Sequence, residues 1–130
     1  MQYLKPLSKK NIYYISKHRY YELKHFCLQY NDYKKNYILL KHMIPDERNE
    51  FADPVGDAAS RMADFRTAIA LIDSAAANTD PFFAGYILKA VTQGLSFDVL
   101  RAQTQIPCGR DYFRNLCRKF YYLLSVSKGV

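Results

Sequence analysis

Apolar residues recur three or four positions apart along almost the whole chain, and this spacing constrains the fold more than any other feature. It is the spacing that places side chains on one face of an α-helix. Alternating runs of β-branched residues, which would indicate strands, are missing, and only five glycines are spread along the chain. We therefore expect an all-α fold, a compact bundle of five or six helices in a single domain over residues 1–130 that ends in a C-terminal helix-turn-helix.

The first part of the chain, residues 1–44, predicts two basic, tyrosine-rich helices. Ser8 is a candidate N-cap for a helix over residues 9–30. The dipeptide Asn31-Asp32 is expected to end that helix, and a second one follows over residues 33–44. After it, Asp, Glu, Asn and Pro predict an acidic loop over residues 45–56.

The central segment, residues 57–94, predicts two further helices. Asp57 is a candidate cap for the first, which is expected to end near residue 79. For the second, we expect Asp80 as the N-cap, Pro81 at the first helical position and Gly94 at the C-terminal end. One face of the first helix carries the apolar residues Met62, Phe65, Ile69, Ile72 and Ala76.

Residues 95–126 predict the helix-turn-helix. Ser96 is expected to cap a short helix, and Ile106 to pack as an apolar plug in a tight connection over residues 105–109. A long amphipathic helix follows, so the order of elements is that of a helix-turn-helix. The expected inward residues of the short helix are Phe97, Val99 or Leu100, and Ala102. Those of the long helix are Phe113, Leu116, Phe120 and Leu124, with Cys117 and Leu123 beside them.

Arginines spaced four apart give the long helix a cationic side. In a helix-turn-helix the first turn of the second helix meets base edges, and later positions meet phosphates. A stripe of this kind is also typical of a solvated helix face. The expected groove contacts are Arg110, Tyr112 and Arg114, and the expected phosphate contacts are Arg101, Arg118 and Lys119.

Charge is distributed unevenly, and the formal total is +7. Residues 1–44 hold nine lysines and arginines against two acids, residues 45–94 hold four against eight, and residues 95–130 hold six against two. Two basic ends flank an acidic middle, which makes a polyanion the first partner to consider.

The basic N-terminal segment admits two interpretations. Lysines and tyrosines that alternate can form a second nucleic-acid surface, with rings that stack on bases or bond to phosphates. Tyrosine is equally enriched where proteins bind proteins. Both interpretations stay open for this segment, whose main residues are Lys5, Lys9, Lys10, Tyr13, Tyr14, Lys17, His18, Arg19, Tyr20, Tyr21, Lys24, Lys34 and Lys35.

The sequence provides little for a metal site or for catalysis. His25 and Cys27 are two apart on a presumed helix and face different sides, and His18 and His42 add no second pair at ligand spacing. The acidic loop lacks the glycine and the spacing of a calcium loop. Phosphate-binding loops and nucleophile motifs are missing as well. We expect no metal, no cofactor and no enzymatic activity.

Three cysteines, Cys27, Cys108 and Cys117, are odd in number and form no C-x-x-C pair, which favours a reducing compartment. The chain begins M-Q-Y-L-K-P without a signal-peptide core, and no run of 18 uncharged apolar residues is present. The expected location is therefore the cytoplasm.

Several stretches resemble a known family. These are I-P-C-G-R-D-Y-F-R and R-K-F-Y-Y-L-L near the C-terminus, and Y-N-D-Y-K-K-N-Y and D-P-V-G-D-A-A-S-R-M-A-D upstream. Together, over residues 25–125, they are similar to phage and prophage transcriptional regulators of Gram-positive bacteria of the ArpU/RinA type, which end in a domain like region 4 of sigma factors. Pro107-Cys108-Gly109 departs from that pattern, because related domains often carry Ser or Thr there.

The resemblance implies sequence-dependent binding of double-stranded DNA by a phage-type regulator, with late genes as its targets. The implied partners are duplex DNA, RNA polymerase or another host protein, and a second copy of the chain as a homodimer, with no membrane. The alternative function is a phage-encoded inhibitor or adaptor that binds a host nucleic-acid enzyme through the same basic surface.

Overall fold

The structure is a computed structural model that describes residues 9–43 and 53–129. Helices make up most of these residues and no strand occurs among them, so the expected all-α fold is confirmed. None of the described helices combines the length and the apolar character needed to cross a membrane. The six helices are α1 (Lys17–Leu28), α2 (Tyr30–Met43), α3 (Asp53–Thr79), α4 (Ala84–Gln93), α5 (Phe97–Thr104) and α6 (Arg110–Lys128).

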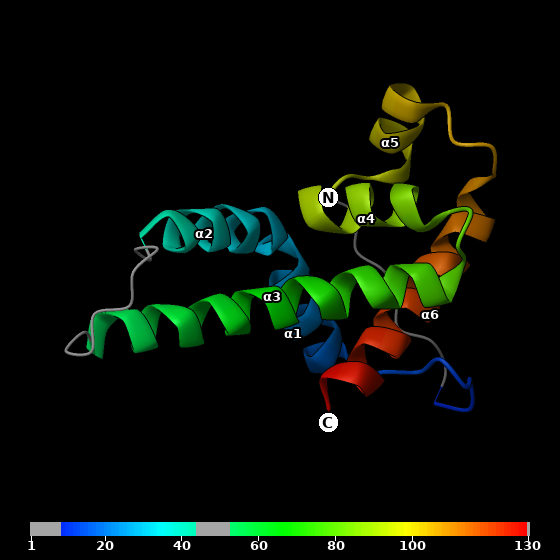
Figure 1. Cartoon of the computed structure of the whole chain (residues 1–130). Helices are drawn as coiled ribbons and strands as arrows, with labels where there is room; N and C mark the ends of the chain where they lie inside the picture. The colour runs from blue at the N-terminus through cyan, green and yellow to red at the C-terminus, as the bar shows by residue number, and fades with distance from the viewer. Residues whose placement is uncertain (1–8, 44–52, 130) are drawn as a thin grey trace.

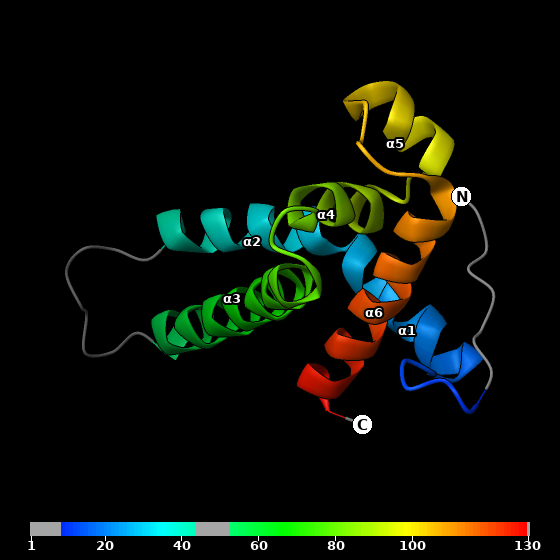
Figure 2. The same cartoon turned by 90° about the vertical axis from the view of Figure 1, so that its right-hand side faces the viewer.

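The molecule has two regions, which we call the body and the arm. The arm is a helical hairpin made by residues 33–43 of α2 and residues 53–66 of α3, and it extends to the left in Figures 1 and 2. The body holds α1, the rest of α3, α4, α5 and α6. Within it, α3 packs against both α4 and α6, and α1 packs against α4 and α6.

Each region has a hydrophobic cluster of its own, and the two differ in size. In the arm, Leu40, Ala58 and Met62 are buried, with Tyr37 and Phe65 packed against them. The core of the body draws on all its helices, so most of the apolar burial lies there. Its most deeply buried side chains are Leu23, Cys27, Ile72, Ile87, Leu100, Phe120 and Leu124.

Polar contacts fasten the helices of the body to one another. Arg19 on α1 donates from Nε to the Ser125 hydroxyl and from Nη2 to the Ser125 carbonyl, both at 3.0 Å. The hydroxyl of Tyr30 donates to Asp73 on α3 at 2.7 Å. The first contact holds α1 against the C-terminal end of α6, and the second holds the start of α2 against α3.

The predicted first helix, residues 9–30, was wrong at both ends. Ser8 lies outside the described residues, and α1 begins only at Lys17, where the Ser16 side chain accepts a hydrogen bond from the Arg19 backbone N–H at 3.2 Å. Before it, Asn11 folds the chain into a turn, because its side chain accepts from the Tyr13 N–H at 2.9 Å. Such local bonds compete with helix formation.

The predicted break at Asn31-Asp32 was also misplaced. Gln29 forms the junction between α1 and α2, and Asn31-Asp32 lies in the first turn of α2. An acidic side chain is stabilising there, because the helix dipole places positive charge at the N-terminus. Asp32 therefore lies at the start of a helix, whereas the sequence predicted that a helix ends there.

The start of α3 corrects the predicted acidic loop. Of residues 45–56, those up to 52 lie outside the described residues, and 53–56 are helical. The helix begins at Asp53, with Pro54 in its first turn, where a missing N–H costs nothing. Asp57 is thus not the cap; it lies one turn inside and pairs with Arg61 at 3.9 Å.

The turn between α3 and α4 lies where it was predicted, but the helix after it begins later than expected. The Asp80 carboxylate accepts from the backbone N–H groups of Phe82 and Phe83 at 2.9 and 3.3 Å. These bonds cap a short turn, and the α-helix itself begins at Ala84 rather than at Pro81. Gly94 ends α4 with a positive φ of 67°, as predicted, since glycine has no Cβ to clash in that conformation.

Candidate nucleic-acid interface

The connection between α5 and α6 follows the sequence prediction. The Ser96 hydroxyl accepts from the Val99 N–H at 3.3 Å and caps α5. At the other end, Gln105 adopts a left-handed conformation, with φ 54° and ψ 43°, and its N–H bonds to the Arg101 carbonyl. Ile106 is buried in the core of the body, as expected for the plug. The chain turns from α5 into α6 within five residues.

Gly109 starts α6 in an extended conformation without a side-chain cap. The first N–H groups of a helix have no partner within it, so those of α6 are left for water or for an anion. Where related domains often carry a Ser or Thr that could cap the helix, this chain has Pro107-Cys108-Gly109, and α6 accordingly begins without a side-chain cap.

The buried faces of α5 and α6 meet in the body, with the Phe97 and Phe113 ring centroids 5.9 Å apart. On α5, Leu100 is fully buried, whereas Val99 and Ala102 are exposed; Ala102 was wrongly expected to face inward. On α6 the predicted stripe is confirmed, because its four residues, Phe113, Leu116, Phe120 and Leu124, are buried.

Arg110, in the first turn of α6, reaches back to α5. Its Nη2 donates to the Asp98 carboxylate at 2.6 Å, and its guanidinium lies 5.8 Å from the centroid of the Phe97 ring. The arginine and aspartate side chains are 44% and 63% exposed. A solvated ion pair of this kind contributes about 0.2–1 kcal/mol, so a stronger anionic or polar partner can displace Asp98.

Arg114 and Arg118 continue the cationic side of α6. Arg114 lies 3.5 Å from the Asp111 carboxylate, and Arg118 donates to the Asn115 side chain at 3.3 Å. Partial burial and the nearby charge of Arg114 lower the pKa of Arg118. Positive charge is therefore crowded along this side, a condition that an added anion relieves.

The six predicted contact residues do not share one face. Each residue advances a helix by roughly 100°, so Arg118 lies about 80° around α6 from Arg110. Tyr112 and Lys119 lie on the other side of the helix, roughly half a turn from Arg110. The exposed ring of Tyr112 is 5.6 Å from Phe83, the residue that precedes α4. Arg101 is exposed on α5.

Sequence reasoning passed over two residues of this surface. Asn115 is exposed on α6, one turn beyond Asp111 and roughly opposite the buried stripe. A helical projection of the sequence shows that position, and asparagine pairs with adenine edges. Asp98, the partner of Arg110, is twelve residues away on another helix, and no sequence signal connects the two.

The N-terminal tyrosines contribute largely to packing. Tyr20 is buried and its ring meets that of Tyr121 edge-on at 5.1 Å. Tyr13 packs in the same way on Tyr122 at 5.5 Å. The exposed groups of this segment include cations such as Lys9, and both interpretations of the segment, nucleic-acid binding and protein binding, use them.

Among the described residues, no three His, Cys, Asp or Glu side chains converge to hold a metal ion. His18 and His25 are exposed on α1, whereas Cys27 faces the core. Burial raises the pKa of the Cys27 thiol, and burial with a contribution from Cys108 raises the pKa of Cys117 to about 12. Both thiols are protonated at neutral pH and are thus weak ligands and nucleophiles.

No protein-family model, curated protein or solved structure matches this chain.

Proposed function

We propose that the chain binds double-stranded DNA through α5 and α6, which serve as a helix-turn-helix, and that it regulates transcription as a phage-type regulator. The observation that carries the proposal is the beginning of α6. There, two exposed or half-exposed arginines, Arg110 and Arg114, stand on a helix that is anchored by the opposite face and entered through a five-residue connection. The proposed activity is binding, without a catalytic step.

The proposed roles follow from position along and around α6. Arg110 and Asn115 lie in the first two turns, where side chains reach guanine and adenine edges. Arg114, which the sequence placed among the groove contacts, is assigned here with Arg118 to phosphates on one side. A helix in the major groove has a phosphate strand on each side, so Tyr112, also expected in the groove, is assigned with Lys119 to the other strand. Arg101, on α5, adds a phosphate contact beyond the groove.

Binding in this mode exchanges one partner of Arg110 for another. In the free protein its guanidinium is held by Asp98, and a guanine edge offers two acceptors in its place. The first backbone N–H groups of α6 have no side-chain cap, and the helix dipole makes this end of the helix partly positive. In this binding mode these N–H groups lie close to the DNA backbone and can bind a phosphate. The ion pair thus holds the arginine near its working position until DNA displaces the carboxylate.

The proposal is tested by selection of duplexes from a random pool, followed by fluorescence anisotropy of the preferred and scrambled duplexes over a salt series. We expect a preferred sequence and a negative dependence of log K on log salt. Arg61→Ala serves as the matched control, since it removes an exposed arginine from the arm. The proposal fails if no sequence is enriched and if Arg110→Ala binds DNA as the unchanged protein does.

One observation favours a second function, binding of a host protein. Ile38, Leu39 and Met43 are exposed on α2 of the arm, a concentration of apolar side chains that is typical of protein interfaces. The selection experiment separates the two functions, because an adaptor that binds only proteins enriches no duplex.

A further inference from the structure

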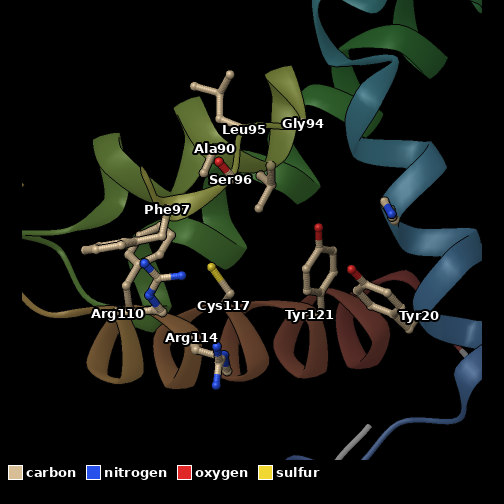
Figure 3. Close-up of a pocket in the computed structure, with 13 residues that line it drawn as sticks. Tyr20, Ala90, Gly94, Leu95, Ser96, Phe97, Arg110, Arg114, Cys117 and Tyr121 are labelled. Carbon is tan, nitrogen blue, oxygen red and sulfur yellow. The ribbon is translucent and has the colours of Figure 1, made fainter. Parts of the chain in front are cut away.

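A cavity of about 100 Å³ lies between α1, the junction of α4 with α5, and α6 (Figure 3). This volume exceeds that of several water molecules and approaches that of engineered cavities that hold benzene. The cavity opens to solvent beside the proposed DNA-binding helix. Its lining residues are Tyr20, Lys24, Ala90, Val91, Gly94, Leu95, Ser96, Phe97, Arg110, Phe113, Arg114, Cys117 and Tyr121.

The charges that line the cavity have one sign. Lys24, Arg110 and Arg114 are cationic, and no acidic residue belongs to the lining. Asp98 compensates Arg110, but Arg114 is 3.5 Å from Asp111, longer than a charge-assisted hydrogen bond. The Lys24 ammonium lies over the rings of Tyr20 and Tyr21, at 5.8 and 5.5 Å. Positive charge therefore exceeds negative charge at this site.

A hydrogen-bond donor faces the same space. In Figure 3 the Tyr121 side chain and the Cys117 side chain both point from α6 toward the side on which α4 lies. Tyr121 as a residue is only 6% exposed, and it belongs to the lining of the cavity. Burial keeps the pKa of this hydroxyl well above its usual value, so it remains a donor. The hydroxyl can therefore donate to an acceptor that enters the cavity.

The remaining wall is apolar. Ala90 and Val91 on α4, Phe97 on α5 and Phe113 on α6 contribute aliphatic and aromatic surface. Small-molecule sites combine such a wall with a few convergent polar groups. A ligand that satisfies all these features has a flat or compact apolar body and an acceptor-rich anionic head.

We propose that this cavity binds a small organic anion, an apolar ring or short chain that bears a carboxylate or a phosphate. The apolar body fills the space beside Val91 and Phe113, and the anionic head lies near Lys24 and accepts from Tyr121, while Arg114 adds positive charge from the edge of the cavity. The site exists without DNA, so this inference is independent of the proposed function.

The test is isothermal titration calorimetry of the full chain with benzoate and phenyl phosphate as anionic probes, and benzyl alcohol as the neutral analogue. We expect saturable 1:1 binding of at least one anion and at least tenfold weaker binding of the alcohol. The anion that binds more tightly identifies the head group. Equal binding of the alcohol and the anions, or saturable binding of none of the three, overturns the proposal.

Three variants locate the site. Lys24→Gln and Arg114→Gln each remove one charge from the edge of the cavity and should weaken anion binding about tenfold. Tyr121→Phe keeps the ring and removes the hydroxyl, with an expected loss of about threefold to tenfold. Arg61→Gln, in the arm, should leave binding unchanged. Circular dichroism and thermal unfolding without ligand show that each variant is folded, and unchanged anion binding in all three cavity variants contradicts the proposed site.

If the proposed function also holds, the two ligands compete, because Arg110 and Arg114 belong both to the cavity and to the DNA-binding surface. A bound anion then weakens DNA binding by the factor by which DNA weakens anion binding. The calorimetry contains no DNA and the selection contains no anion, so either proposal can fail alone.

Discussion

The arm and the body use the same element, α3, in different ways. Among the described residues of the arm, α3 packs against α2, and Leu40 of α2 is buried with Ala58 and Met62 of α3, while Ile38 and Leu39 of α2 stay exposed. In the body its C-terminal half is covered by α4 and α6, and Ile72 is fully buried. The N-terminal half of α3 thus packs in a two-helix hairpin and its C-terminal half in the core of the body. The free energy of local opening should therefore be lower in the N-terminal half than in the C-terminal half.

The largest expected effect is in the body. Phe120→Ala should lower the free energy of unfolding by about 3–5 kcal/mol, because the fully buried ring leaves a large cavity. Urea denaturation followed by circular dichroism measures the loss. Phe82→Ala is the matched control, since Phe82 is exposed, and it should cost about 0.5 kcal/mol or less. Similar losses for both variants would remove the distinction between core and surface.

In the arm, Met62→Ala should cost about 2 kcal/mol, at the low end for such truncations, because a cluster between two helices collapses more easily. The effect should stay local. Hydrogen exchange should accelerate for amides of residues 33–43 and 56–66 and remain unchanged for α6. Equal acceleration in α6 would mean that the arm and the body unfold as one unit.

A third difference concerns charge. Arg110→Ala should cost about 1–3 kcal/mol on the preferred duplex and reduce discrimination among duplexes. Arg118→Ala should weaken all duplexes by a similar factor and lower the salt slope by about one. Arg61→Ala, in the arm, should do neither. Fluorescence anisotropy of the three variants over a salt series measures these effects. If Lys9, Lys10 or Lys17 substitutions abolish binding and these do not, the N-terminal segment carries the function.

The smallest effect comes from the two ion pairs. Asp98→Asn removes the carboxylate that holds Arg110 at 2.6 Å, and it should tighten DNA binding by about fivefold or less, the value of an exposed pair. Asp57→Asn removes the arm's corresponding pair with Arg61, at 3.9 Å, and should leave affinity unchanged. Titration of the same duplex with each variant measures the two changes in affinity. An equal gain for both would indicate general repulsion of DNA rather than release of Arg110.

Sequence patterns predicted correctly those features of the fold that depend on a single helix or a single turn. The apolar spacing predicted the helices and the buried stripe of α6, and Gly94, Ser96 and Ile106 marked the junctions around α5. Helix starts failed where two caps compete within a few residues. Ser16 rather than Ser8 precedes α1, because Asn11 folds the chain before it into a turn. Asp53 rather than Asp57 begins α3, because Pro54 is accommodated in the first turn of the helix.

The candidate site was predicted in part for the same reason. Spacing of four brought out Arg110, Arg114 and Arg118, which are neighbours on one helix. It could not show that Asp98 holds Arg110, or that Lys24 and Tyr121 border the same cavity as Arg114. These are contacts between helices distant in sequence, and they depend on how α1 and α5 pack on α6 rather than on any local pattern.

The continuity of α3 also has a mechanical consequence. A continuous helix of 27 residues, about 40 Å long, connects the arm to the packing of α3 on α4 and α6. The portion of α3 in the arm measures about 20 Å, so a tilt of α3 by about 10° at its packed end would move the tip by about 3.5 Å. A change in how α3 packs on α6 would therefore displace the arm, and a probe attached to residue 61 would report it.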